Sequence, residues 1–193
     1  MIGLFERAAE MQAFCDVHRW RFCFIGGLAV QRWGEPRVTR DVDVTLLTGF
    51  GDERAFIDVL LQEYEPRRAD AAEFALAYRV LLLRFSDGVG LDVALGGLSF
   101  EEEVVTRASP FEVLPGIVLR TCSAEDLVVL KAFAGRPIDW QDVRMVLARQ
   151  GVEQLDWQYI IRNLSPLADA KEDSSIVPHL QSLRDQVQSR ASG

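Results

Sequence analysis

Two aspartates separated by one residue, Asp41 and Asp43, are the residues of this chain best suited to chemistry. On a β-strand, side chains at positions i and i+2 project from the same face, a few ångströms apart. Two like charges at that distance repel and raise each other's pKa, whereas a divalent cation neutralises both, and carboxylate oxygens suit Mg²⁺. The spacing therefore predicts a magnesium site.

A glycine pair, Gly26 and Gly27, precedes the aspartates in the run FIGGLAVQRWGEPRVTRDVDVTLL. A Gly-Gly turn that opens a helix offers backbone N–H groups and the positive end of the helix dipole, both of which suit a phosphate. Glycine pairs mark turns in many proteins, so this pair alone is weak evidence for a phosphate site. It becomes informative because of the order of the expected elements, which is strand, turn, helix and then the Asp-x-Asp strand. Together the two features predict a site that holds a nucleoside triphosphate on a metal ion.

A third acid, Asp92, stands between Leu91 and Val93 in an otherwise apolar segment. A buried carboxylate is costly unless it is hydrogen-bonded or bound to metal, so Asp92 is either a metal ligand or a hydrogen-bonded structural acid. In the first case, metal ions on Asp41, Asp43 and Asp92 activate the attacking oxygen and neutralise the leaving pyrophosphate of a nucleotidyl transfer, with Asp92 available as base. The alternative for the Asp41–Asp43 pair is an exposed strand face.

Several charged residues outside the strands are further candidates. Arg37, which precedes the aspartate pair, either neutralises phosphate through its bidentate guanidinium group or remains solvated. On a helix expected at 124–134, Lys131 projects from an apolar face, where it either extends to solvent or reaches an anion such as a triphosphate. Asp139 fits a helix-capping role, whereas Asp142 is free to face Lys131 or a substrate.

Composition limits the classes of protein open to this chain. With 193 residues, 49% of them hydrophobic, it can form one compact domain or one domain with a small helical appendage. A net charge of −8 argues against broad, non-specific binding of nucleic acid, and so against extended DNA binding.

The sequence shows no sign of a membrane segment. The apolar runs are too short to cross a bilayer and the first residues lack a signal-peptide pattern, so we expect a cytoplasmic protein with no membrane partner. The three cysteines show no CxxC spacing, and we expect them to be buried free thiols.

Periodicity and turn signals predict the elements that position these residues. The first part is mixed α/β and the last third helical, which predicts a core at 1–121 and a helical subdomain at 122–193. Asp87 and Gly88, between two apolar runs, predict a β-hairpin with a type I′ turn. The helices are expected at 4–19, 28–33, 53–62, 124–134, 140–149, 153–164 and 176–187, and the strands at 22–25, 41–47, 80–86, 89–95 and 117–120.

The run GGLAVQRWGEPRVTRDVDVTLL, residues 26–47, closely resembles the signature of the polymerase-β-like nucleotidyltransferase superfamily. The later run SAEDLVVLKAFAGRPIDWQDVRMVL, residues 123–147, is similar to the C-terminal part of AbiEii-type nucleotidyltransferases, a toxin-like branch found in type IV toxin–antitoxin systems. The two runs cover about a quarter of the chain. The resemblance implies an α/β nucleotidyltransferase fold, with a short mixed sheet flanked by helices and a C-terminal helical subdomain.

The same resemblance implies roles for the residues singled out above. The implied ligands of Mg²⁺ or Mn²⁺ are Asp41, Asp43 and Asp92. The implied contacts to the phosphates of an NTP are Gly26, Gly27 and Lys131. The acid of the C-terminal motif is then Asp139 or Asp142.

The resulting hypothesis is metal-dependent transfer of a nucleoside monophosphate from an NTP to an acceptor hydroxyl. One acceptor class is tRNA or another RNA, as in toxin-like members, with a cognate antitoxin as partner. The other is a small molecule such as an aminoglycoside or lincosamide antibiotic, because a cationic or polar ligand suits an acidic cleft. A non-catalytic protein that binds nucleotide or a partner is a third hypothesis, and the complete set of three carboxylates argues against it.

Overall fold

The computed structural model describes residues 2–191, which form two compact units. Within these residues, unit 1 comprises 2–28 and 38–122, and unit 2 comprises 29–37 and 123–191. The chain crosses from the first unit to the second inside helix α2 (Gly26–Trp33) and returns before the next strand. The segment 29–37 packs with residues 105 to 117 positions further along the chain, so contacts distant in sequence determine this division.

Unit 1 is built on one mixed sheet. Its strands are β1 (Phe22–Phe24), β2 (Asp41–Leu47), β3 (Glu65–Pro66), β4 (Val80–Arg84), β5 (Gly90–Gly96), β6 (Ser109–Leu114) and β7 (Ile117–Thr121). They lie in the order β3-β4-β5-β2-β1-β7-β6. Strand β2 is antiparallel to β1 but parallel to β5, and this parallel register places Asp43 directly beside Asp92.

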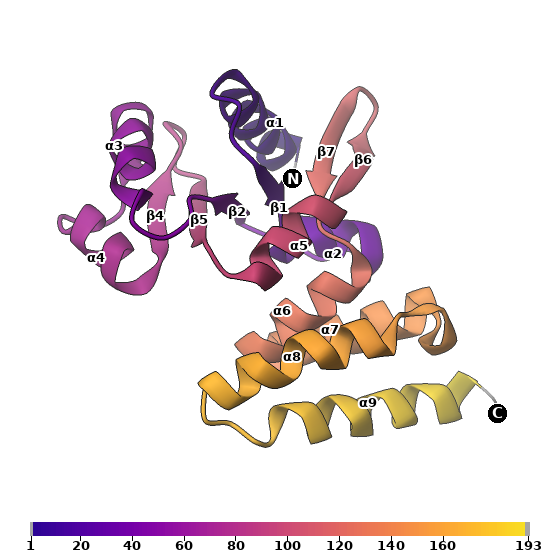
Figure 1. Cartoon of the computed structure of the whole chain (residues 1–193). Coiled ribbons are helices and arrows are strands. Elements are labelled where there is room, and N and C mark those ends of the chain that lie inside the picture. The colour runs from indigo at the N-terminus through magenta and orange to yellow at the C-terminus, as the bar shows by residue number, and fades with distance from the viewer. Residues whose placement is uncertain (1, 192–193) are drawn as a thin grey trace. The chain divides into compact units, whose positions relative to one another are not determined.

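Alternation along β2 separates the core face of the sheet from the face that carries the aspartates. Val42, Val44 and Leu46 are fully buried in the core, so Asp41 and Asp43 project from the opposite face. The core also takes apolar side chains from helices α1 (Ile2–Val17), α3 (Glu53–Glu63) and α4 (Ala71–Tyr78). Figure 1 shows α1 and α3 above the sheet.

Helix α5 (Ser99–Arg107) packs on the face of the sheet that carries the aspartates, below the strands in Figure 1. Cys23 Sγ lies 4.0 Å from the carbonyl oxygen of Val104 in this helix, and Cys23 pairs with Thr45 across β1 and β2. The helix thus covers the Thr45 end of this face. The aspartates lie at the other end of β2, where α2 begins.

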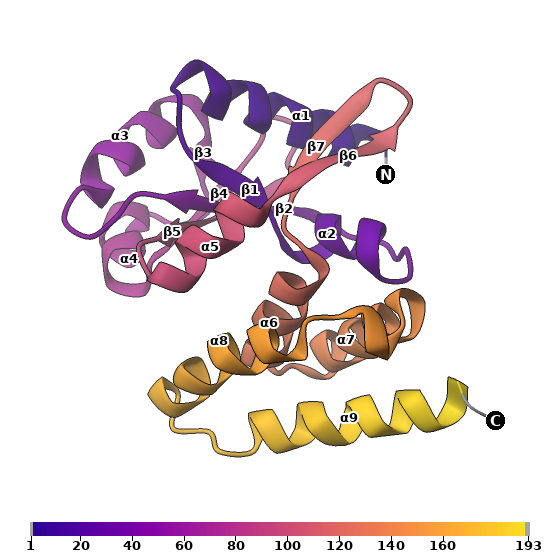
Figure 2. The same cartoon turned by 45° about the vertical axis from the view of Figure 1, so that its right-hand side comes forward.

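Unit 2 is helical apart from its loops, and Figure 2 shows its helices packed side by side. Besides residues 29–33 of α2, the unit contains α6 (Ala124–Ala134), α7 (Pro137–Gln150), the 3₁₀ turn η1 (Val152–Gln154), α8 (Trp157–Ala170) and α9 (Ile176–Ala191). Gly135, with a φ of 72°, ends α6, and Pro137 opens α7. Asp126 forms a capping box with Ser123 and also accepts a 2.6 Å hydrogen bond from the hydroxyl of Tyr159, which joins α6 to α8.

The predicted α/β class is confirmed, and both β2 and α6 begin and end at the predicted residues. The predicted type I′ turn is wrong: Asp87 keeps a negative φ and Gly88 alone is left-handed, at 87°. Phe85 N–H donates to Val89 O, so the hairpin has a three-residue loop that ends in a left-handed glycine. The helix predicted at 153–164 is also wrong at its start, because Asp156 interrupts it as the N-cap of α8.

The cysteines and the helix lengths bear on two further expectations. Cys15, Cys23 and Cys122 are buried free thiols, as predicted. Burial raises the pKa of the Cys15 thiol to about 12, so this thiol is unreactive at neutral pH.

Within residues 2–191, no helix combines the length and the apolar character needed to cross a membrane.

Candidate functional site

Asp43 lies against the start of α2, where Gly26 leaves room for its carboxylate. The N–H of Gly27 donates to Oδ2 of Asp43 at 3.3 Å. A β-carbon on Gly26 would lie 2.1 Å from the same oxygen, and Gly26 itself has a φ of 56°. Glycine is therefore required at position 26 both by the backbone conformation and by the carboxylate. The Gly-Gly turn positions Asp43 as well as opening the helix.

Asp41 is accommodated by a third glycine, Gly90, its partner in the parallel pairing of β2 and β5. A β-carbon on Gly90 would lie 2.1 Å from Oδ1 of Asp41. The missing side chain lets the Asp41 carboxylate lie over β5, on the strand that carries Asp92. No local pattern in the sequence marks Gly90, because its position beside Asp41 depends on the strand register.

Asp92 forms an ion pair with Arg67, which follows β3. Burial raises the pKa of Asp92; Arg67 opposes that rise and the charge of Asp41 adds to it, so the pKa lies above its ordinary value. Arg67 also lies close to Gly90, since a β-carbon there would be 3.4 Å from its Nη1. Arg67 thus supplies positive charge to the neighbouring carboxylates. Arg67 belongs to no local motif, so the sequence alone did not predict its place at the site.

The carboxylate site, defined as Asp41, Asp43 and Asp92, has the donor chemistry of a site for a hard divalent cation. Its members share one face of two adjacent strands, and glycines leave space beside Asp41 and Asp43. As they stand, no three His, Cys, Asp or Glu side chains in residues 2–191 converge closely enough to form a metal-binding group. The three residues fit Mg²⁺ in ligand type and strand register, but their carboxylates do not converge here and Asp92 is paired with Arg67.

Lys131 in unit 2 is buried between two carboxylates. Its Nζ donates to Oδ1 of Asp139 at 2.9 Å and lies 2.9 Å from Oδ2 of Asp142. Only 6% of the lysine is exposed, and both aspartates are buried as well. The sequence left open whether Asp139 or Asp142 is the acid of the C-terminal motif. In the structure both aspartates bind Lys131. A contact between Lys131 and a triphosphate stays a prediction.

Arg37 and Arg136 complete what we call the Lys131 cluster. Arg37 binds Asp142 through two parallel hydrogen bonds, Nε to Oδ1 at 2.7 Å and Nη2 to Oδ2 at 2.8 Å. Arg136 donates from Nε to Oδ2 of Asp139 at 2.6 Å. The cluster thus alternates in charge, as Arg37, Asp142, Lys131, Asp139 and Arg136.

The charges of the Lys131 cluster shift the pKa values of its two acids. Burial pushes the pKa of Asp139 upward, but hydrogen bonds from Arg136 and Lys131 outweigh it and hold the pKa below its ordinary value. Burial likewise acts on Asp142, where hydrogen bonds from Arg37 and Lys131 outweigh it and lower the pKa. Both aspartates are therefore ionised at neutral pH, and each balances part of the positive charge around it.

The structure gathers the sequence-predicted residues into two sets, one in each unit. In unit 1, Gly26, Gly27, Asp41, Asp43 and Asp92 lie together at one end of the sheet. The second set is the Lys131 cluster in unit 2, which includes Arg37 because residues 29–37 pack with that unit.

Comparisons with known proteins define the fold. No family model and no curated protein sequence matches the chain. A crystal structure of an antigenic nucleotidyltransferase-like protein from Paracoccidioides brasiliensis is similar, with a TM-score of 0.53, 14% identity, and coverage of 94% of this chain and 92% of that chain. The lincomycin-bound lincosamide antibiotic adenylyltransferase LnuA is similar with a TM-score of 0.50, 12% identity, and coverage of 71% and 92%. The chain has a nucleotidyltransferase-like fold, as the sequence predicted.

Substitution of Gly90 by alanine tests the role of this glycine beside Asp41. We expect the Gly90→Ala protein to fold, because the group that the new β-carbon displaces is the end of a flexible side chain. Displacing one ligand should weaken Mn²⁺ binding by about tenfold or more, measured by titration calorimetry. Gly3→Ala is the matched control, since that position has open space around it. Unchanged Mn²⁺ affinity in a folded Gly90→Ala protein contradicts the role given to Gly90.

Acid titration tests the charges of the Lys131 cluster. The folded-state pKa values of Asp139 and Asp142 lie below the ordinary 3.8, so these groups stabilise the fold above that pH and lose their contribution as pH falls through the folded-state pKa. We expect Asp142→Asn to lower the free energy of unfolding by about 3 kcal/mol at neutral pH. The difference from the parent protein should shrink below about pH 4.

Urea unfolding followed by tryptophan fluorescence over a pH series measures both quantities. Asp185→Asn, at an exposed position of α9, provides the control and should leave the pH profile unchanged. A difference between Asp142→Asn and the parent that stays constant from neutral to acid pH argues against the ionised cluster.

Proposed function

We propose that this protein is a Mg²⁺-dependent nucleotidyltransferase that moves a nucleoside monophosphate from an NTP to an acceptor hydroxyl. The observation that carries the proposal is the register of β2 and β5, which sets Asp43 beside Asp92 on the face that also bears Asp41. The adjoining start of α2, with its Gly-Gly turn, supports a phosphate site at the same end of the sheet. The nucleotidyltransferase-like fold agrees with this assignment.

The three carboxylates are the proposed metal ligands. A bound Mg²⁺ would neutralise triphosphate charge and lower the pKa of the acceptor hydroxyl. We assign the proton of that hydroxyl to Asp92, the carboxylate that the neighbouring strand β5 places beside Asp43. The backbone N–H groups at the start of α2 would hold the phosphates, so transfer proceeds by in-line displacement that depends on positioning and charge.

The Lys131 cluster is proposed to hold Arg37 in position. Lys131 is buried and engaged by two aspartates, which favours a positioning role over direct contact with phosphate. Asp142 holds the guanidinium of Arg37, whose side chain is 32% exposed, in a bidentate pair, and a contact between Arg37 and a phosphate stays a prediction from the sequence. Lys131 then sets the position of Asp142 and, through it, that of Arg37.

The acceptor is proposed to be a small polar or cationic molecule. LnuA, which shares the fold, is a lincosamide antibiotic adenylyltransferase, and a net charge of −8 disfavours a polyanionic acceptor. The second candidate is RNA. It is favoured by the resemblance of residues 123–147 to AbiEii-type toxin-like enzymes, which would act with a cognate antitoxin.

Incubation with each α-labelled NTP in Mg²⁺ or Mn²⁺ tests the proposal, with total tRNA and a panel of aminoglycosides and lincosamides as acceptors. We expect the parent protein to transfer label and Asp43→Asn to lose transfer by at least about a hundredfold while keeping its fold, because a metal ligand is removed. Asp52→Asn, at an exposed position of unit 1, is the control and should transfer label normally. Normal turnover by a folded Asp43→Asn protein would falsify the metal role.

A second prediction concerns competition between Arg67 and the metal for Asp92. Because the guanidinium group occupies this carboxylate, Arg67→Gln should lower the Mn²⁺ concentration needed for half-saturation by several-fold. Calorimetric Mn²⁺ titration measures the effect, and Arg84→Gln, whose ion pair is with Glu65, should leave it unchanged. Weaker Mn²⁺ binding by Arg67→Gln means that Arg67 positions Asp92 for the metal instead of competing with it.

A further inference from the structure

An open cavity of about 400 Å³ lies in unit 1 at the end of β1 away from the carboxylate site. Leu47 N–H donates to the carbonyl of Arg21 at this end, whereas Ile25 N–H donates to the carbonyl of Asp43 at the other. The cavity is thus separated from Asp43 by four residues of β2, about 13 Å at roughly 3.3 Å per residue. We call it the arginine cavity, after three of its lining residues, Arg19, Arg21 and Arg120.

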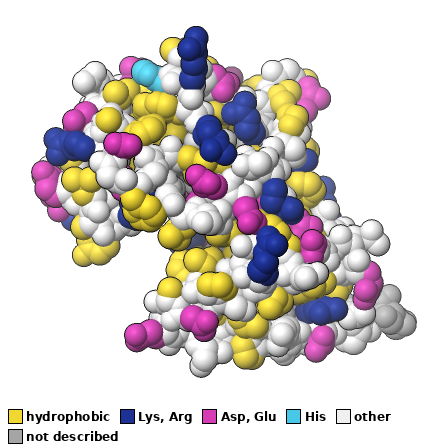
Figure 3. Space-filling model, in the orientation of Figure 1, with side chains coloured by type: hydrophobic (Ala, Val, Ile, Leu, Met, Phe, Trp, Pro, Cys, Tyr) yellow, Lys and Arg dark blue, Asp and Glu magenta, His cyan; other side chains and the backbone are white. Residues whose placement is uncertain are grey.

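The charges of the arginine cavity are unbalanced. Neither Arg19 nor Arg21 forms an ion pair within the described part of the chain; Arg21 donates from Nη2 to Oγ1 of Thr106 at 3.1 Å. Arg120 Nη1 lies 3.5 Å from Oδ1 of Asp16, the one acid that lines the cavity. Three guanidinium groups against one carboxylate leave a local charge of +2 in a protein whose net charge is −8. Figure 3 shows basic side chains gathered on this face of unit 1.

Aromatic packing holds the walls of the arginine cavity in place. Trp20 stacks on His18, with ring centroids 4.8 Å apart, and packs against Phe56 at 4.9 Å. Arg120 lies over the buried ring of Phe22, 4.9 Å from its centroid. These contacts hold Arg120 and the segment between α1 and β1 from which Arg19 and Arg21 project.

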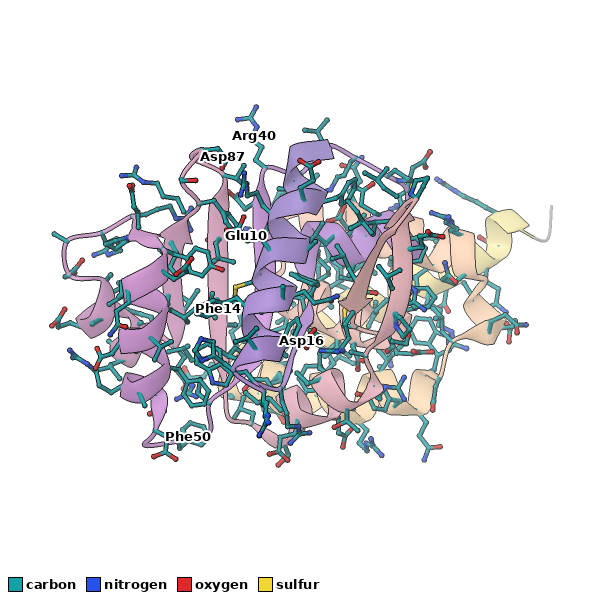
Figure 4. All side chains as sticks on the ribbon, turned by 90° about the horizontal axis from the view of Figure 1, so that it is seen from above. Glu10, Phe14, Asp16, Arg40, Phe50 and Asp87 are labelled. Carbon is teal, nitrogen blue, oxygen red and sulfur yellow. The ribbon has the colours of Figure 1, made fainter. Side chains whose placement is uncertain are left out.

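Helix α1 contributes to the arginine cavity through Phe14 and Asp16, which point in different directions. Figure 4 shows Phe14 on the side of α1 that faces α3, and Asp16 on the side that faces β7. Asp16 is therefore the acid that reaches Arg120, whereas Phe14 packs against Trp20 and Tyr64. One turn of helix thus contributes both the support for Trp20 and the single carboxylate of the cavity.

We propose that the arginine cavity binds a small, multiply charged phosphate ligand, such as pyrophosphate or a free nucleotide, at a site separate from the carboxylate site. Guanidinium groups bind phosphate oxygens through paired hydrogen bonds, and the hydroxyl of Thr106 adds a polar partner. The volume suits a small molecule. Because arginine supplies the positive charge here, binding needs no divalent cation and remains after the aspartates of the carboxylate site are neutralised.

Calorimetric titration of pyrophosphate and of ADP into the full chain in EDTA tests this proposal. We expect saturable binding that weakens with added salt and persists in Asp41→Asn/Asp43→Asn. Arg21→Gln, at an exposed position, should weaken binding by about tenfold, because a charge-assisted hydrogen bond is lost. Asp16→Asn should strengthen binding, because it removes the only opposing charge. Arg54→Gln, whose ion pair with Asp58 lies on α3, is the matched control and should have no effect.

The outcomes separate the proposal from its alternatives. Equal affinity for pyrophosphate and ADP supports a site for phosphate alone, and tighter ADP binding supports a nucleotide site with the base against Trp20. Absence of saturable binding in EDTA overturns the proposal, as does equal weakening by Arg21→Gln and Arg54→Gln. Binding of a single-stranded oligonucleotide without binding of either small ligand also overturns it, in favour of a nucleic-acid contact. Since every readout is binding without metal, loss of the proposed transferase activity leaves this test intact.

Discussion

Mutual repulsion among carboxylates on one sheet face is the constraint on which unit 1 depends. The parallel pairing of β2 and β5 brings Asp43 beside Asp92, and alternation along β2 adds Asp41 to the same face. Such a group is stable only with positive charge nearby and with space for each carboxylate. The fold supplies the charge through Arg67 and the space through glycines at positions 26 and 90. The pKa of Asp92 is raised because burial, together with the charge of Asp41, outweighs the opposing effect of Arg67.

In unit 2 the buried group is a lysine, and carboxylates supply the opposite charge around it. A buried lysine is costly unless it is paired, and Lys131 has two aspartates within 2.9 Å. Those aspartates are in turn held by Arg136 and Arg37, so no member of the Lys131 cluster is buried without a partner. Arg37 belongs to this cluster because residues 29–37 leave unit 1 in the middle of α2. A segment between the Gly-Gly turn and the aspartates therefore serves the packing of the helical unit.

Local pattern was enough to predict the elements whose residues alternate or repeat strongly. Strand β2 has alternating Asp and Val, and α6 has a capping box and a terminal glycine, so both were predicted to the residue. Elements with weak patterns were missed: β3 has two residues, α4 has eight, and β6 includes Pro110 and two exposed positions. Such segments take their structure from partners, as β6 does by pairing with β7. The hairpin turn was misjudged because Asp-Gly also fits a loop with only its glycine left-handed.

The sequence by itself determined the α/β class, the Asp-x-Asp strand beside a Gly-Gly turn, and the resemblance that implied a nucleotidyltransferase-like fold. These are local features, set by the alternation of a strand, the φ freedom of glycine and the caps of helices. Only the tertiary structure decided that Gly90 lies beside Asp41, that Arg67 pairs with Asp92, and that Arg19, Arg21 and Arg120 line one cavity. Each of these depends on strand register or on packing between distant segments, where a shift of one residue sends a side chain to the other face of the sheet.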